Sequence, residues 1–123
     1  MLRTGVDVLE IARLQRALER HGDAFLARVY TPAEIAAYRH SLQSLAARWA
    51  AKEAVAKALG TGIGEVGWRE IEVLADERKA PRLQLHGRAQ ALAQALGLTE
   101  WAISLSHTDA LAIAFVVATG SDA

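Results

Sequence analysis

The segment Arg48-Trp49-Ala50-Ala51-Lys52-Glu53-Ala54-Val55-Ala56-Lys57-Ala58-Leu59-Gly60-Thr61-Gly62 lies near the middle of the 123-residue chain. It belongs to an Ala-dominated run that predicts a helix from Leu42 to Leu59, because Ala has the highest intrinsic helix propensity. The glycines between Gly60 and Gly64 are expected to end that helix. We predict that it is the longest helix of the chain, and that its small side chains let other backbones pack close to it.

A strand and two shorter helices are predicted before this segment. Residues 2–8 are compatible with a strand, and apolar residues at helical spacing then predict a helix from Ile11 that stops at Gly22. The motif Thr31-Pro32-Ala33-Glu34 is typical of a helix start. It offers a capping hydroxyl, a first-turn proline and a glutamate three residues after the cap.

The second half of the chain is predicted to be rich in strands. Four segments have strand-like patterns: residues 70–75, 82–85, 101–106 and 111–117. Pro81 marks the second of them as an edge strand, and an Ala- and Leu-rich helix is predicted over residues 87–96. The fold class is therefore predicted to be α+β, with one domain over residues 1–123. The helices of the first half are expected to pack on a small, mainly antiparallel sheet.

The charge of the chain is balanced, with 14 Lys and Arg against 14 Asp and Glu. Such a balance argues against a generic nucleic-acid binder, because phosphate neutralisation needs a basic excess. Residues 1–60 nevertheless hold nine basic and six acidic residues, while residues 61–123 hold five and eight. Much of the basic surplus comes from these residues: Arg13, Arg16, Arg20, Lys52 and Lys57. We therefore expect acidic or phosphate-bearing ligands to bind the first half.

Neither membrane insertion nor disulfide formation is expected. The longest uninterrupted apolar run, from Ala110 to Ala118, has nine residues, whereas a membrane span needs roughly 18. The chain has no Cys, which fits a cytoplasmic protein.

The hydrophobic core of a single chain is expected to be thin. Because 26 of its residues are Ala, few bulky side chains remain for a core, and association between copies would help to stabilise the fold.

Two positions carry carboxylates that need an explanation. Asp7 lies between apolar neighbours of a predicted strand, where a carboxylate is disfavoured unless it is paired, hydrogen-bonded or bound to a cation. It is either a cap for the following helix or a metal or catalytic ligand. Glu53 and Lys57 are four residues apart on the long helix. They form either a surface ion pair or part of a polar site.

A glycine-rich loop and a histidine are the other polar candidates. Gly60-Thr61-Gly62 follows a helix, where glycine ordinarily caps, although the backbone amides of such a loop can also approach a phosphate. It is not a Walker A loop, because no Lys and Ser or Thr follow the last glycine. His107 is adjacent to Ser106 on a predicted strand, so their side chains point to opposite faces and a Ser-His-Asp triad is rejected.

Three separated segments together resemble the holo-acyl-carrier-protein synthase family, the small group of 4'-phosphopantetheinyl transferases. The first is Gly5-Val6-Asp7-Val8-Leu9-Glu10-Ile11-Ala12-Arg13, the second is the central segment quoted above, and the third is Ser104-Leu105-Ser106-His107-Thr108. In this order and spacing they span nearly the whole chain. The main departure from the family pattern is Trp49, where many members carry Phe.

The resemblance implies a 4'-phosphopantetheinyl transferase-like fold and an enzyme of fatty acid biosynthesis. Such enzymes transfer the phosphopantetheine arm of coenzyme A to a serine of apo acyl carrier protein and release adenosine 3',5'-bisphosphate. The resemblance also implies a homotrimer with its sites between subunits.

The same resemblance implies roles for individual residues. Asp7 and Glu53 would bind Mg²⁺, and Lys57 would contact the pyrophosphate. The nucleotide would be held by further residues: Arg48, Lys57, Gly60, Thr61, Gly62 and His107. The proton of the attacking serine would pass to Glu53, to a metal-bound water or to His107. Our preferred choice is a water positioned by the carboxylates, with His107 contacting the substrate.

A stripe of arginines completes the set of candidate site residues. Arg13, Arg16 and Arg20 share one face of the first predicted helix, opposite its apolar stripe. We interpret them as a binding surface for the acidic acyl carrier protein. An ordinary solvated helix face is the alternative.

Two other functions compete with the enzyme. One is a non-catalytic nucleotide- or effector-binding module that has kept the family scaffold and lost the chemistry. The other is a purely structural oligomerisation domain. It ranks last, because it would leave Asp7, Glu53 and Lys57 without a common purpose.

Overall fold

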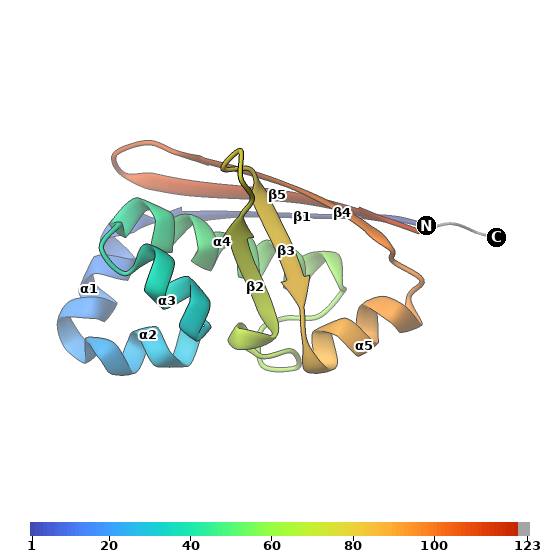
Figure 1. Ribbon diagram of the computed structural model, residues 1–123, viewed down its shortest axis with the longest axis horizontal. Coiled ribbons are helices and arrows are strands. Elements are labelled where there is room, and N and C mark those ends of the chain that lie inside the picture. The colour runs from blue at the N-terminus through green and yellow to red at the C-terminus, as the bar shows by residue number, and fades with distance from the viewer. Residues whose placement is uncertain (121–123) are drawn as a thin grey trace.

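The computed structural model describes residues 1–120 of the chain. The elements in chain order are β1 (Leu2–Glu10), α1 (Ile11–His21), α2 (Asp23–Val29), α3 (Pro32–Tyr38), α4 (Leu42–Ala58), the 3₁₀ helix η1 (Trp68–Glu70), β2 (Ile71–Ala75), β3 (Pro81–Leu85), α5 (Gly87–Ala95), β4 (Glu100–His107) and β5 (Leu111–Thr119) (Figure 1). The predicted α+β class is confirmed. No helix of the described residues is long and apolar enough to cross a membrane.

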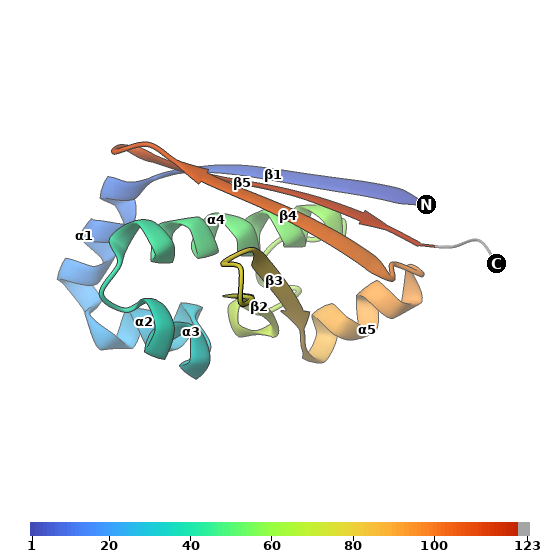
Figure 2. The same ribbon diagram turned by 45° about the horizontal axis from the view of Figure 1, so that its top comes forward.

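A three-stranded antiparallel sheet, in the order β1-β5-β4, lies against the long helix α4. The first strand pairs with the last one, with Leu2 opposite Thr119 and Glu10 opposite Leu111. Figures 1 and 2 show α4 along one face of this sheet, while no element of residues 1–120 covers the other face. The sheet is therefore packed on one side only.

Strand β1 approaches α4 most closely at Gly5. A Cβ atom built on Gly5 would lie 1.9 Å from the carbonyl oxygen of Ala54 and 3.1 Å from the backbone nitrogen of Ala58, so only glycine fits there. The neighbouring Ala50 and Ala51 are fully buried. The prediction that the Ala-rich helix lets other backbones pack close is confirmed.

The two-stranded sheet of β2 and β3 is tied to the helices by a buried ion pair. The ammonium group of Lys52 donates to Glu34 over 2.7 Å, and both side chains are fully buried. The same ammonium donates to the carbonyl oxygens of Trp68 and Ile71. Glu34 also accepts the backbone N–H of Val73 over 2.8 Å. This pair therefore joins α3 and α4 to β2.

The start of α3 agrees with the sequence, whereas α2 was not predicted. The backbone N–H of Thr31 donates to Glu34 over 2.9 Å, and that of Glu34 donates to the Thr31 hydroxyl over 3.2 Å, so the predicted capping motif is present. Helix α2 has seven residues, about two turns, which is too short for an apolar period to repeat.

The edge position predicted for Pro81 is confirmed. Strand β3, which begins at Pro81, pairs with β2 alone within the described residues.

Candidate functional site

Asp7, Glu53 and Lys57 meet where β1 crosses α4. Side chains alternate along a strand, so Asp7 is on the same face of β1 as Gly5 and is directed at the helix. Glu53 and Lys57 are one turn apart on α4. The structure thus brings together the residues predicted for metal and pyrophosphate binding, and we call them the carboxylate cluster.

Within this cluster, Lys57 pairs with Asp7. Its ammonium nitrogen lies 3.2 Å from Oδ1 of Asp7 and 2.9 Å from the carbonyl oxygen of Val6. No ion pair between Glu53 and Lys57 occurs in the part of the chain that the structure describes. Asp7 is not the helix cap either, because the N-cap of α1 is Glu10. Both of the simpler interpretations from the sequence are therefore wrong.

The pKa of Glu53 is raised above its usual value. Burial is the largest cause and the negative charge of Asp7 is the second, while Lys57 and Arg13 act in the opposite direction. The two carboxylates are therefore close enough to repel each other, and a cation bound by both would relieve this repulsion.

The donor set of the cluster fits a magnesium ion that shares its ligands with a substrate. Mg²⁺ is usually bound by one or two protein carboxylates, with phosphate and water oxygens in the other positions. Asp7 and Glu53 supply two such carboxylates. No group of three or more His, Cys, Asp or Glu residues able to hold a metal occurs within residues 1–120. An ion at this cluster would take its further oxygen ligands from the substrate and from water.

The loop after α4 lies beside Arg3 of β1. Gly60 has a φ of +80°, in the region that favours glycine, so the predicted helix stop is confirmed. A Cβ atom built on Gly60 would lie 3.3 Å from Nη2 of Arg3. This guanidinium supplies positive charge at a helix end whose dipole repels anions. Arg3 was not predicted as a site residue, because its only signal is a contact with a residue 57 positions away.

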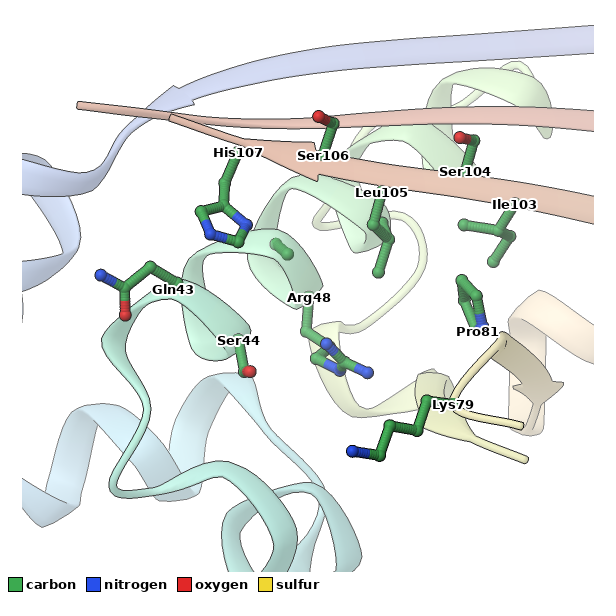
Figure 3. A pocket seen from close by; sticks show the side chains of 11 residues that line it. Gln43, Ser44, Arg48, Lys79, Pro81, Ile103, Ser104, Leu105, Ser106 and His107 are labelled. Carbon is green, nitrogen blue, oxygen red and sulfur yellow. The ribbon is translucent and has the colours of Figure 1, made fainter. Parts of the chain in front are cut away.

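A pocket of about 340 Å³ lies between α4, the β2–β3 turn and β4 (Figure 3). Its cationic or titratable side chains are Arg48, Lys79 and His107, and no Asp or Glu of the described residues lines it. We call it the cationic pocket. In Figure 3 His107 points into the pocket, whereas Ser106 points to the other side of β4, as predicted from their alternation. Lys79 was not predicted, because nothing in a charged turn indicates a pocket.

Arg48 is held firmly at the wall of the cationic pocket. Its Nε donates to the carbonyl oxygen of Val73 over 3.2 Å, and its Nη2 donates to the Tyr38 hydroxyl over 2.9 Å. The guanidinium carbon lies 3.8 Å from the centroid of the Tyr38 ring, and Arg48 is only 8% exposed. Arg48 therefore joins α4 to α3 and β2 while it borders the pocket.

The cationic pocket and the carboxylate cluster are on opposite faces of α4. Arg48 precedes Lys57 by nine residues, and at about 100° per residue the two side chains are about half a turn apart. In the sheet, β5 separates β1, which carries Asp7, from β4, which carries His107. A single chain does not bring all the residues predicted for coenzyme A into one site.

The arginine face of α1 begins beside the carboxylate cluster. Arg13, Arg16 and Arg20 are all exposed. The guanidinium carbon of Arg13 lies 5.1 Å from the centroid of the Trp49 ring, and its charge also acts on Glu53. Trp49 is buried, and its indole N–H has no hydrogen-bond partner within residues 1–120. Replacing Trp49 by Phe would therefore lose no hydrogen bond.

Lys52 does not belong to the basic surface that the sequence predicted. Its side chain is fully buried and bound to Glu34. Burial lowers the pKa of Lys52, and the neighbouring Glu34 carboxylate opposes this effect. Of the two lysines on α4, only Lys57 is available to a ligand.

Comparison with known proteins finds relatives over nearly the whole chain. The family model of the 4'-phosphopantetheinyl transferase superfamily matches residues 3–116. The holo-[acyl-carrier-protein] synthase of Herpetosiphon aurantiacus is 54% identical over 127 residues, which cover 98% of this chain and 100% of that protein. The holo-[acyl-carrier-protein] synthase of Moorella thermoacetica is 48% identical over 124 residues, which cover 98% of this chain and 96% of that protein.

Solved structures of similar sequence share the fold. The crystal structure of Helicobacter pylori holo-[acyl-carrier-protein] synthase in complex with coenzyme A matches with a TM-score of 0.86 and 32% identity, over 94% of this chain and 99% of that one. The structure of a Bacillus anthracis holo-(acyl-carrier-protein) synthase in complex with CoA (3',5'-ADP) matches with a TM-score of 0.79 and 32% identity, over 97% and 96%. In each of these two comparisons the similarity covers nearly the entire length of this chain and of the solved one.

Proposed function

The chain belongs to the 4'-phosphopantetheinyl transferase superfamily as a holo-[acyl-carrier-protein] synthase, and we propose that its reaction takes place at the carboxylate cluster. The enzyme transfers the 4'-phosphopantetheine group of coenzyme A to a serine of apo acyl carrier protein, which supports fatty acid biosynthesis. The observation that carries our proposal is the meeting of Asp7 and Glu53 beside Lys57. Residues 1–123 would act as one domain, in the cytoplasm.

Asp7 and Glu53 would hold a Mg²⁺ ion together with phosphate oxygens of coenzyme A. Their mutual repulsion, seen in the raised pKa of Glu53, supports this assignment because it would disappear when a cation is bound. When bound, the ion would neutralise charge that builds up on the pyrophosphate as its P–O bond breaks.

Lys57 would contact the pyrophosphate from the neighbouring turn of α4. Its side chain is 53% exposed, so the ammonium group can move from Asp7 to an incoming phosphate. The guanidinium of Arg3 would add a further donor on the same side of the helix. The backbone N–H groups of Gly60 and Thr61 already donate to the carbonyl oxygens of Lys57 and Ala56, so from this loop the amide of Gly62 would be the one to contact a phosphate.

The proton of the carrier serine would pass to a water positioned by Glu53. Glu53 would orient this water, because its carboxylate is part of the carboxylate cluster, where the pyrophosphate would bind. His107 lines the cationic pocket on the other side of α4. It would therefore contact bound coenzyme A and not the serine that attacks at the carboxylate cluster of its own chain.

Coenzyme A would bind between two subunits of a homotrimer. The carboxylate cluster and the cationic pocket are on opposite faces of α4, so within one chain the helix separates them. A nucleotide in the pocket of one subunit and a pyrophosphate at the cluster of its neighbour would use both sites at once. In this arrangement Arg48 and His107 hold the adenosine end of the molecule.

The uncovered sheet face supports association. Four large apolar residues of β1 and β5 are 45% to 70% exposed: Leu2, Val6, Val8 and Phe115. Twelve of the 27 buried apolar residues within residues 1–120 are Ala, so the core of one chain is thin. Covering a large apolar side chain contributes about 1.5–3 kcal/mol. An interface over this face would therefore add substantially to the core.

The arginine face of α1 would bind the acidic acyl carrier protein. Because Arg13 is next to Glu53, a carrier bound to this face would bring its serine to the carboxylate cluster. Arg16→Glu with Arg20→Glu is expected to weaken carrier binding and to leave coenzyme A binding unchanged. Arg13 is left intact in this test, because it also packs on Trp49.

The decisive experiment is the mass of the carrier after incubation with this protein, coenzyme A and Mg²⁺. We expect a gain of one phosphopantetheine group, loss of the gain with EDTA, and its return with added Mg²⁺. Asp7→Asn and Glu53→Gln should each abolish transfer while circular dichroism shows a folded protein. Full activity in either variant would overturn the metal assignment.

Calorimetry separates the enzyme from the competing non-catalytic module. The enzyme is expected to bind coenzyme A more tightly when Mg²⁺ is present, because ion and pyrophosphate share the carboxylate cluster. Binding that is indifferent to Mg²⁺, together with an unmodified carrier, would favour the module.

A further inference from the structure

Trp49 is buried where α1 meets α4, next to the carboxylate cluster. It is only 7% exposed, and it precedes Glu53 by one turn of the helix. The rings of Phe25 and Trp68 pack against it in edge-to-face geometry. Their centroids lie 5.3 Å and 6.1 Å from that of Trp49, with interplanar angles of 73° and 62°. These two contacts fix the orientation of the indole ring.

The guanidinium of Arg13 lies over the face of this ring. Its carbon is 5.1 Å from the centroid of Trp49, within the distance of about 6 Å that defines a cation–π contact. An aromatic face is partly negative, and that of Trp attracts cations best. Arg13 has no ion pair within residues 1–120, and neither Arg16 nor Arg20 lies over a ring there. The indole therefore restrains one arginine of the three.

The indole N–H of Trp49 indicates a role beyond packing. It is buried and has no hydrogen-bond partner within the described residues. A buried donor without an acceptor costs stability, and Phe would avoid that cost because it has no such donor. The cost is explained if the more negative face of Trp is needed under the Arg13 guanidinium.

We propose that Trp49 is a positioning residue, which holds the Arg13 guanidinium in place for the acyl carrier protein. This inference rests on the proposed function, in which the arginine face of α1 binds the carrier. A guanidinium already held on a ring loses less conformational freedom when it pairs with a carrier carboxylate than a mobile one does. Coenzyme A has no proposed contact with Arg13 or Trp49. The effect of Trp49 is therefore confined to the KM for the carrier.

The test replaces the Trp49 side chain by that of tetrafluorotryptophan. The fluorine atoms withdraw electrons and nearly abolish the negative ring face, while the shape of the side chain hardly changes. We expect the KM for the carrier to rise about fivefold, with kcat, the KM for coenzyme A and the melting temperature unchanged. Trp49→Phe keeps an aromatic face, so its KM for the carrier should stay within about twofold of wild type.

Two further variants separate positioning from packing. Arg13→Met removes the charge but keeps an aliphatic chain over the indole. In this background fluorination should have no further effect on the KM for the carrier, because both changes act through one contact. Phe25→Leu is the matched control, since it removes a ring contact of Trp49 and leaves the indole in place. It is expected to lower the melting temperature without changing the KM for the carrier.

Failure of this inference and failure of the proposed function give different results. If wild type transfers phosphopantetheine and the fluorinated protein has the same KM for the carrier, only the role of Trp49 is overturned. Equal effects of fluorination with and without the Arg13 charge would likewise make Trp49 a structural residue. If wild type neither modifies nor binds the carrier, the proposed function fails, and a positioning role toward that carrier fails with it.

Discussion

Glu53 destabilises the metal-free fold when it is charged. Burial and the charge of Asp7 raise its pKa above the ordinary value of 4.5. A raised pKa means that the folded state binds the proton more tightly than the unfolded chain. The associated stability is complete below about pH 4 and is lost as the pH rises through the raised folded pKa.

Glu53→Gln is therefore expected to increase the free energy of unfolding at pH 7.5 in the absence of divalent ions. The difference from wild type should shrink toward zero near pH 4, where Glu53 is neutral in both states. Urea unfolding at the two pH values measures this directly. A variant less stable than wild type at pH 7.5 would show that Glu53 is not strained by its surroundings.

Residue composition could predict the long helix but not which of its lysines is accessible to a ligand. Lys52 and Lys57 are five residues apart on α4, yet one is buried against Glu34 and the other is exposed beside Asp7. Ala surrounds both, so no apolar stripe marks the buried face of this helix. The roles proposed for Asp7 and Glu53 rest on the resemblance, because the separation of the two residues in the sequence hides the contact between β1 and α4.

At the scale of elements, the contact between β1 and α4 depends on Gly5. Gly5→Ala puts a methyl group 1.9 Å from the carbonyl oxygen of Ala54, so the strand must move away from the helix. Overpacking of this kind costs about 1–3 kcal/mol, and more where backbone must shift. We expect a lower melting temperature and loss of transfer, because Asp7 moves with the strand.

Gly62→Ala is the matched control for the stability part of this prediction. A Cβ atom on Gly62 would meet nothing within 4 Å. Its melting temperature should therefore remain close to that of wild type. Equal destabilisation by the two substitutions would contradict the role assigned to the close approach at Gly5.

The buried ion pair joins elements that otherwise share few contacts. Lys52→Met leaves the Glu34 carboxylate buried without its partner and is expected to lower the free energy of unfolding by about 3–5 kcal/mol. Adding Glu34→Gln removes the unpaired charge, so the double variant should be more stable than Lys52→Met alone. Urea unfolding of the three proteins measures this, and a Lys52→Met variant as stable as wild type would exclude the pair as an anchor.

At the scale of the whole molecule, we propose that the uncovered sheet face forms the interface between subunits. Val6→Lys with Phe115→Lys places two charges on that face. The proposed trimer is expected to dissociate and transfer activity to fall sharply, because each proposed shared site would need two subunits. Sedimentation velocity measures the mass, and Gln90→Lys at an exposed position of α5 is the control. An unchanged mass with both substitutions would place the interface elsewhere.

The fold class could be predicted from the sequence, whereas the strand order could not. Alternation along residues 101–106 indicates a strand but carries no information about its partner. Capping at Thr31 could be predicted because all its parts lie within four residues. The cationic pocket could not, because it combines a helix, a turn and a strand that are distant in the sequence.

The pairing of β1 with β5 also sets an order of events during synthesis. β1 is the first strand made, yet its sheet partner follows about a hundred residues later, with Leu2 opposite Thr119. A nascent chain therefore carries an unpaired apolar strand until β5 emerges, and such non-local pairing slows folding and favours aggregation.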